Sequence, residues 1–195
     1  MMKGPKELTF DQLNEARLKA LRNAKELLGD AKLLFAHKRW PRVVFLCRVA
    51  EEEMGKYWYL VGARVVATAG KIDWKGFWKT FRSHMGKTQR LHHLELLGLK
   101  GKHLMRQLLE LEKRANELER LRTSALYSDL SAKGFVSPGD VIGEKMAQGA
   151  LKVNMGRLRL VELLEKKILK SGAALRDLTP EEVEAMLGEH RDTGI

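Results

Sequence analysis

The sequence predicts an all-α protein, an antiparallel helical bundle of about five long helices plus a short C-terminal helix. Apolar residues recur every three or four positions along most of the chain, which is the spacing of an amphipathic helix. Capping boxes, in which side chains satisfy free helix amides, occur at Thr9–Gln12 and Thr179–Glu182. The prolines at positions 5, 41, 138 and 180 all stand where a helix could begin, and no convincing strand run is found.

The turns between helices are placed at residues that interrupt the apolar pattern. Trp40 and Pro41 end the apolar pattern of the first helix, and Gly70 marks the turn after the second helix. Gly98 and Gly101 mark the turn that precedes the fourth helix. The expected helices therefore cover about 10–37, 41–68, 74–97, 102–130, 138–170 and 180–190, with a loop at 131–139.

The charge of the chain is high and uneven. The net charge is +11, yet residues 171–195 hold two basic and six acidic side chains, which leaves 34 basic against 19 acidic on residues 1–170. We expect residues 1–170 to form the bundle and residues 171–195 to add a short acidic helix to the same domain. A basic body favours RNA, DNA or an acidic protein as partner, because phosphate contacts release counterions. A Lys- and Arg-rich surface without such a ligand would give the same composition.

Composition excludes several classes of protein. A hydrophobic content of 44% is too high for a mainly disordered chain. A single cysteine, Cys47, can form neither an intramolecular disulfide nor a Cys-based metal site, which predicts a reducing compartment and a cytoplasmic protein. Arg48 and Arg64 interrupt the most apolar runs, so no membrane helix is expected. The chain contains no Glu-x-x-His, P-loop, Gly-x-Ser-x-Gly or Rossmann motif.

Three consecutive carboxylates, residues 51–53, stand in the middle of the otherwise apolar second helix. Glu53 lies only about 60° from the core stripe on a helical wheel, so partial burial is expected. Glu52 and Lys56 are four apart and can pair along one face, although such a pair is also common on a solvated surface. Gly55 costs about 1 kcal/mol relative to Ala inside a helix, which indicates that another group approaches the backbone there.

Two further groups of residues could carry chemistry. His84 and Lys87 are three apart, and a histidine beside a lysine suits proton transfer and phosphate binding, although a surface cation cluster would look the same. Arg122 and Asp129, seven apart on the fourth helix, would share a face, with Tyr127 pointing elsewhere unless the helix distorts. Taken alone, this arginine could stabilise a helix dipole and this tyrosine could be a core residue. Neighbouring histidines at 92 and 93 point about 100° apart, so neither a metal nor a cofactor is expected.

In their order along the chain these residues resemble the AbiV-type abortive infection proteins of bacteria, within the HEPN superfamily of helical-bundle proteins. The resemblance covers roughly residues 10–150 and rests on four elements. They are Asn23-Ala24, Leu27-Leu28 and Asp30-Ala31; a Glu-Glu-x-Gly-Lys signature at Glu52, Glu53, Gly55 and Lys56; a His-x-x-Lys at His84 and Lys87; and Arg122, Ala125-Leu126-Tyr127, Asp129 and Ser137-Pro138.

The resemblance implies phage defence by host shutdown, with a phage-encoded trigger. Many HEPN relatives are metal-independent endoribonucleases or toxins that work as dimers. Their usual nuclease motif is Arg, four to six residues, then His, and no such pair occurs here. Arg122 and Tyr127 have that spacing with Tyr in place of His, so we expect His84 to move protons instead.

The resemblance thus favours a phosphate site with cations from Lys56, Lys87 and Arg122, oriented by Glu52 or Glu53. A different function is compatible with the same residues: a non-catalytic helical module that binds a phage or translation component, held by a buried polar network. The candidate catalytic residues are Glu52, Glu53, Lys56, His84, Lys87, Arg122, Tyr127 and Asp129.

Overall fold

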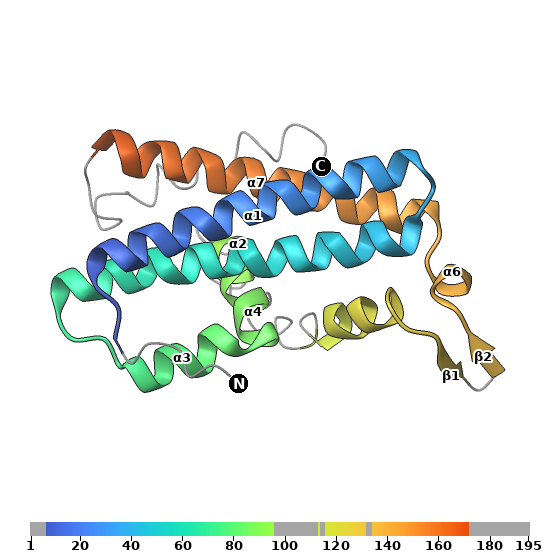
Figure 1. Ribbon diagram of the computed structural model, residues 1–195, viewed down its shortest axis with the longest axis horizontal. Coiled ribbons are helices and arrows are strands. Elements are labelled where there is room, and N and C mark those ends of the chain that lie inside the picture. The colour runs from blue at the N-terminus through green and yellow to red at the C-terminus, as the bar shows by residue number, and fades with distance from the viewer. Residues whose placement is uncertain (1–6, 96–112, 114–115, 132–133, 172–195) are drawn as a thin grey trace, which may run out of the picture.

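Three long helices lie side by side and form the body of the protein. The computed structural model describes residues 7–95, 113, 116–131 and 134–171. Helices α1 (Phe10–Ala36), α2 (Trp40–Ala69) and α7 (Glu144–Ser171) run along the long axis and pack against one another (Figure 1). On the other side of α2 lie α3 (Trp74–Arg82) and α4 (His84–Glu95). The all-α bundle is confirmed, with α2 as its central helix.

Helix starts lie close to where the sequence predicts them. Thr9 closes a full capping box with Gln12 ahead of α1. Pro41 occupies the first turn of α2, where its missing amide hydrogen costs no helical bond. Asp73 accepts a hydrogen bond from the Gly76 amide at 3.1 Å and caps α3. The core between these helices is built from α1, α2 and α7, and a smaller aromatic cluster around Phe77 joins α3 to α2.

The expectation of a single helix over residues 74–97 is wrong, because the helix is interrupted at Ser83. Ser83 has extended backbone angles, φ −77° and ψ 124°, and its hydroxyl accepts a hydrogen bond from the Gly86 amide at 3.0 Å. Serine competes with the helix in this way and favours the N-cap position. The break separates α3 from α4, and His84 becomes the first residue of the second of these helices.

The expectation of a helix reaching residue 130 and of no strands is also wrong. Within the described residues this helix covers 116–124, and a hairpin follows, formed by β1 (Asp129–Ser131) and β2 (Gly134–Val136). The two strands are antiparallel, with Leu130 opposite Phe135. Gly134, the first residue of β2, has φ 107°, a left-handed backbone conformation that favours glycine over residues with a side chain.

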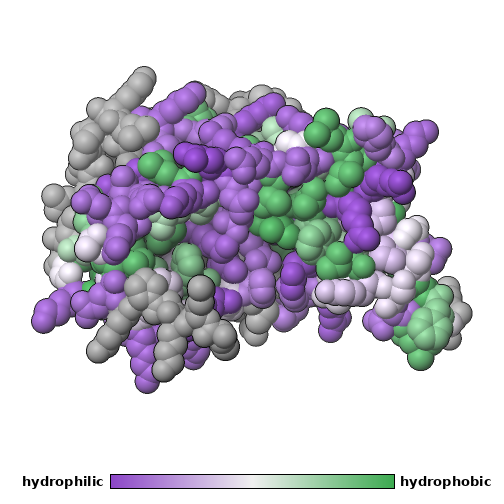
Figure 2. Space-filling model, in the orientation of Figure 1, coloured by the Kyte–Doolittle hydropathy of each residue, from purple (hydrophilic) through white to green (hydrophobic). Residues whose placement is uncertain are grey.

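The hairpin projects from the bundle and exposes apolar side chains. Leu130 is 67% and Phe135 84% exposed. Figure 2 shows a green apolar group at this end of a mostly hydrophilic face. These strands are only three residues long, too short to give the alternating pattern that identifies strands in a sequence.

The helix expected from Pro138 is divided as well. A short helix, α6 (Pro138–Val141), is followed by the extended residue Ile142, whose buried side chain joins the core, and α7 begins at Glu144. The expected helix at 180–190, the acidic segment 171–195 except Ser171, and most of the expected fourth helix lie outside the described residues.

Gly55 is the point at which α4 crosses α2. A Cβ atom added there would overlap the carbonyl oxygen and carbon of Lys87, so the close approach expected from the sequence is confirmed. Because the obstacle is backbone, it cannot rotate away. This contact fixes the distance between the helix that carries residues 51–53 and the helix that carries His84 and Lys87.

We expect Gly55→Ala to lower the free energy of unfolding by about 1–3 kcal/mol, the usual cost of overpacking. Gly62→Ala is the matched control on the same helix, because a Cβ there meets nothing within 4 Å. The control should gain up to about 1 kcal/mol from the better helix propensity of Ala. Urea denaturation of the two variants checks the difference, and a stabilised Gly55→Ala protein would contradict the close approach.

Candidate functional site

Glu52 is the centre of a polar cluster that joins three helices. Its side chain is only 9% exposed. Oε2 lies 2.6 Å from Nδ1 of His84 and 3.3 Å from Nζ of Lys87, both on α4. Oε1 lies 3.9 Å from Nε of Arg122, on the helical segment 116–124. A buried carboxylate thus holds three basic side chains that the sequence predicted to act together.

His84 is the exposed member of this Glu52 cluster. Its side chain is 54% exposed, whereas Lys87 is 7% exposed. With a proton on Nδ1 donated to Glu52, the Nε2 atom becomes the basic nitrogen of the imidazole. A carboxylate that orients a histidine in this way is the arrangement used by histidine general bases. The cluster therefore presents an oriented proton acceptor to solvent, beside buried positive charge.

Arg122 is held by a second carboxylate that the sequence analysis did not identify. Its Nη2 and Nε atoms donate to Glu119 at 2.7 and 3.1 Å. The hydrogen bonds that Arg122 donates to Glu119, followed by the charges of Glu119, Glu52 and Tyr127, outweigh partial burial and raise the pKa of Arg122. The same hydrogen bonds lower the pKa of Glu119. Arg122 is therefore a permanent cation in a fixed plane.

The expected pairing of Glu52 with Lys56 is not found. Lys56 forms its ion pair with Glu53, three residues earlier, because Glu52 is turned toward α4. Glu53 is buried at 8% exposure, which confirms its expected burial.

Arg122 and Asp129 do not share a helix face, because the helix ends before Asp129 enters β1. The same helix end frees Tyr127 from helical geometry. Its ring is 62% exposed and close enough to Arg122 to interact electrostatically. Tyr127 is thus a surface residue beside the Glu52 cluster rather than a core tyrosine.

Glu51 is the centre of a second buried cluster, on another side of α2. Nη1 of Arg157 lies 2.8 Å and Nε2 of His92 3.3 Å from Oε1 of Glu51, and Arg48 pairs with the other carboxylate oxygen. Burial would raise the pKa of Glu51, but the charges of Arg157 and Arg48 and the hydrogen bond and charge of His92 outweigh it and lower this pKa. The Glu51 cluster thus ties α2 to α4 and α7.

A third cluster, missed by sequence reasoning, lies between α1, α2 and α7. Glu165 accepts a hydrogen bond from the Tyr57 hydroxyl at 2.7 Å and pairs with Arg17. Burial, followed by this hydrogen bond, raises the pKa of Tyr57. The sequence position of Arg17 indicates this cluster, because Arg17 stands on the apolar stripe of α1 between Leu13 and Ala20. A charged residue on a core stripe requires a buried partner.

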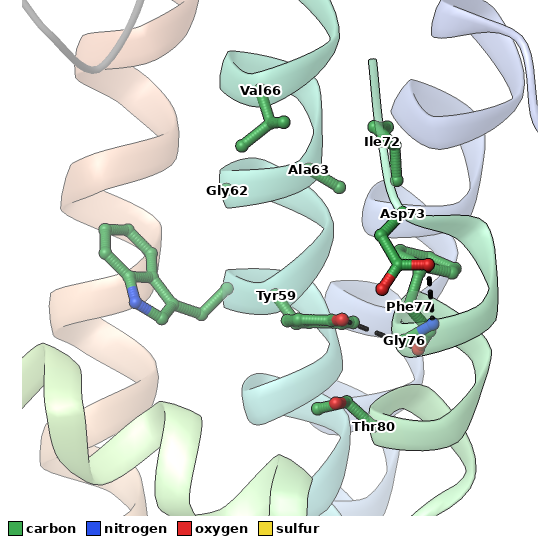
Figure 3. A pocket seen from close by; sticks show the side chains of 10 residues that line it. Tyr59, Gly62, Ala63, Val66, Ile72, Asp73, Gly76, Phe77 and Thr80 are labelled. Atoms are coloured by element: carbon green, nitrogen blue, oxygen red, sulfur yellow. Dashed lines mark hydrogen bonds between the residues drawn. The ribbon is translucent and has the colours of Figure 1, made fainter. Parts of the chain in front are cut away.

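One cavity lies away from all three clusters. It has a volume of about 450 Å³ and lies between α2 and α3, lined by Tyr59, Gly62, Asp73 and Phe77 among others (Figure 3). Tyr59 stacks on Phe77, and Asp73 is engaged in capping α3. A second cavity, of about 350 Å³, is lined by three residues of the Glu51 cluster. Neither of these two cavities is lined by a residue of the Glu52 cluster.

The described residues contain no group of three or more His, Cys, Asp or Glu side chains able to hold a metal ion. No described helix is both long and apolar enough to cross a membrane.

The fold is that of an all-α protein and is consistent with a HEPN-like helical bundle. The family model described as AbiV, of the HEPN group, matches residues 12–158, which include every described residue of the Glu52 cluster. The chain therefore belongs to the AbiV family, and this membership implies a role in abortive infection, a defence against phage. No curated protein and no solved structure matches the chain.

The pKa of Glu51 predicts how stability depends on pH. Because the folded pKa is below its ordinary value of 4.5, Glu51 stabilises the protein above that pH, and this contribution is lost as the pH falls through the folded pKa. Glu51→Gln leaves two arginines without their carboxylate and should cost about 3 kcal/mol at pH 7.

Urea denaturation between pH 7 and pH 3 measures this effect. The stability curves of wild type and Glu51→Gln should converge toward acid pH, whereas exposed Glu26→Gln should stay within about 0.5 kcal/mol of wild type at pH 7. Parallel curves for wild type and Glu51→Gln would show that the carboxylate is not charged in the folded protein.

Proposed function

We propose that this protein is a metal-independent endoribonuclease that shuts down translation in a phage-infected host. The observation that carries the proposal is His84, oriented by the buried Glu52 and flanked by Lys87 and Arg122. An oriented histidine with adjacent cations is what RNA cleavage by an internal nucleophile requires. Membership of the HEPN group and the basic charge of the chain support RNA as the substrate.

In the proposed reaction, Nε2 of His84 removes the proton from a ribose 2′-hydroxyl. The 2′-oxygen attacks the adjacent phosphorus, and the bond from phosphorus to the 5′-oxygen breaks. The Tyr127 hydroxyl gives its proton to the leaving 5′-oxygen, so the products are a 2′,3′-cyclic phosphate and a 5′-hydroxyl, and the proton held by His84 returns to the Tyr127 phenolate through solvent. We assign this step to Tyr127 because it stands at the spacing from Arg122 where the family's nuclease motif has its histidine.

The remaining candidate residues are assigned to the charge that develops on the phosphate. Lys87 and Arg122 stabilise the negative charge that develops on the phosphate oxygens. Lys56, one helical turn beyond Glu52 on α2, adds positive charge and is oriented by Glu53. Asp129 is exposed in β1. The observation that supports a role for it is its position in the sequence, two residues after Tyr127. We further propose that the protein acts as a homodimer in the cytoplasm and is activated by a phage-encoded trigger.

A second function is favoured by the burial of the carboxylates. Glu52 and Glu53 are less than 10% exposed, as residues of a structural polar network would be. Under this alternative the protein is a non-catalytic module that binds a phage or translation component. Removing Glu53 or Arg122 would then chiefly lower the melting temperature, whereas active-site residues can be removed with little loss of stability.

The cleavage test uses purified protein on total bacterial RNA and on a tRNA pool, with EDTA and separately with Mg²⁺. We expect EDTA-resistant cleavage that falls about 100-fold or more in His84→Ala, the usual contribution of a general base, with RNA affinity largely kept. Arg122→Ala should lose a similar factor through the charge it supplies. Exposed His37 and Arg159, replaced by Ala, are matched controls.

The end groups of the products give an independent reading. A 2′,3′-cyclic phosphate and a 5′-hydroxyl support the internal nucleophile, and the opposite pattern of a 3′-hydroxyl and a 5′-phosphate contradicts it. Unchanged cleavage by His84→Ala would remove this residue from the mechanism. No cleavage by folded protein, with a lowered melting temperature in Arg122→Ala, would favour the binding module.

The C-terminal segment supplies a further test, because we propose that residues 171–195 form an acidic appendage to the basic bundle. Deletion of residues 174–195 removes six acidic and two basic side chains and should raise RNA affinity, most strongly at low salt, where charge attraction is least screened. Filter binding at two salt concentrations and sedimentation of the shortened chain check this. If the shortened chain has the same RNA affinity and the same oligomeric state as the full chain, the segment is passive.

A further inference from the structure

Helix α3 carries three basic side chains and no acidic one. Lys75, Lys79 and Arg82 are spaced by four and three residues, so they lie within about 60° of one another on a helical wheel. Phe77 occupies the opposite face and is buried in the aromatic cluster that joins α3 to α2. Asp73, just before the helix, is engaged in capping it. The three cations therefore form a basic stripe on the face of α3 that is turned away from the core.

The needs of the fold do not account for this basic stripe. Lys75 and Lys79 are exposed, and neither forms an ion pair within the part of the chain that the structure describes. A helix dipole favours cations in the last turn, which explains Lys79 and Arg82. Lys75 stands in the first turn, where the same dipole disfavours a cation. A negatively charged ligand would account for all three positions.

The basic stripe ends beside the Glu52 cluster. Arg82 is the last residue of α3, and His84, two residues later, begins α4. The guanidinium carbon of Arg82 lies 5.6 Å from the centre of the Trp78 ring, a cation–π contact that limits the motion of this arginine. In Figure 1, α3 leads to the start of α4, and the segment 116–124 lies on the same side of α2. A polyanion on the stripe would thus reach the exposed imidazole.

We propose that the basic stripe binds the phosphates of an unpaired RNA strand next to the bond that is cleaved. The inference rests on the proposed function and adds the place of the substrate and its single-stranded form. From Lys75 to Arg82, α3 rises about 10 Å, which is the rise of about three stacked nucleotides. A base-paired strand keeps its 2′-oxygen out of line with the bond that must break, so a strand cleaved at His84 must be locally unpaired.

A membrane surface fits the basic stripe less well than RNA does. A helix that binds a membrane surface inserts its apolar face between the lipids. The apolar face of α3 is already packed, because Phe77 is 4% exposed and its ring contacts Tyr59 of α2. The stripe therefore offers charge without a free apolar face, which suits a phosphate backbone.

The test measures RNA binding rather than cleavage. It uses fluorescence anisotropy in EDTA on the full chain carrying His84→Ala, so that the RNA stays intact. The probe is a uridine 20-mer, which does not pair with itself, and a 20-base-pair RNA duplex is the comparison. The stripe variant adds the changes Lys75→Gln, Lys79→Gln and Arg82→Gln. Its matched control removes the same charge from exposed residues on α1 and the turn after it, with Arg22→Gln, Lys32→Gln and Lys38→Gln.

The stripe variant should bind the uridine 20-mer about 100-fold more weakly at about 0.1 M salt. The slope of log affinity against log salt should fall by about 2, because each phosphate contact on a single strand contributes about 0.7. The double variant Lys75→Gln and Lys79→Gln keeps the cation–π contact of Arg82 and should lower the slope by about 1.4. The control variant, and the duplex with the stripe variant, should each change less than about threefold in affinity.

The inference is overturned if the stripe variant binds the uridine 20-mer as its parent does. Equal losses in the stripe and control variants also overturn it, since net charge alone would then attract RNA. An equal loss for the duplex contradicts the single-stranded substrate. Loss of binding to phosphatidylglycerol vesicles with unchanged RNA binding would assign the stripe to a membrane surface.

These readings are separate from the test of the proposed function. RNA cleavage by the wild type together with unchanged binding by the stripe variant would refute the inference alone. Weakened binding by the stripe variant without any cleavage by the wild type would refute the nuclease and leave the stripe as a surface that binds unpaired RNA.

Discussion

Three buried carboxylates on one helix organise the elements around it. Consecutive residues on a helix point about 100° apart, so Glu51, Glu52 and Glu53 project in three directions from α2. Glu51 holds basic groups of α4 and α7, and Glu52 holds α4 and the segment 116–124. Each carboxylate would be costly to bury alone, because unpaired charge is strongly disfavoured in a protein interior. The neighbouring helices must therefore sit where their basic side chains reach these oxygens.

This requirement explains why sequence reasoning succeeded for the helices α1 and α2 and failed for the partners of Glu52. The apolar stripes of α1 and α2 and the mid-helix Gly55 are local patterns, and they predicted both helices and the close approach at Lys87. Glu52 was predicted to pair with Lys56 because only partners on the same helix can be identified from spacing. Its actual partners lie 32, 35 and 70 residues away along the chain, where no periodicity connects them.

The break at Ser83 and the hairpin were missed for different reasons. The helical pattern continues through residues 74–95, and the break depends on one hydroxyl that caps the second helix at the Gly86 amide. The hairpin strands have three residues each, and Leu130 and Phe135 face solvent, so neither length nor burial marks them. Of the predicted site residues, the structure brings His84, Lys87 and Arg122 to Glu52. The roles of Glu119 and Glu51 were not predictable, because both depend on tertiary contacts.

The break at Ser83 is also what gives His84 its position. As the first residue of α4, His84 lies at an exposed helix start, while Lys87, one turn later, is buried against α2. An unbroken helix would have carried α4 onward in the direction of α3, away from the approach of Lys87 to Gly55. The cap thus allows one short helix to place a buried cation and an exposed imidazole on the same carboxylate.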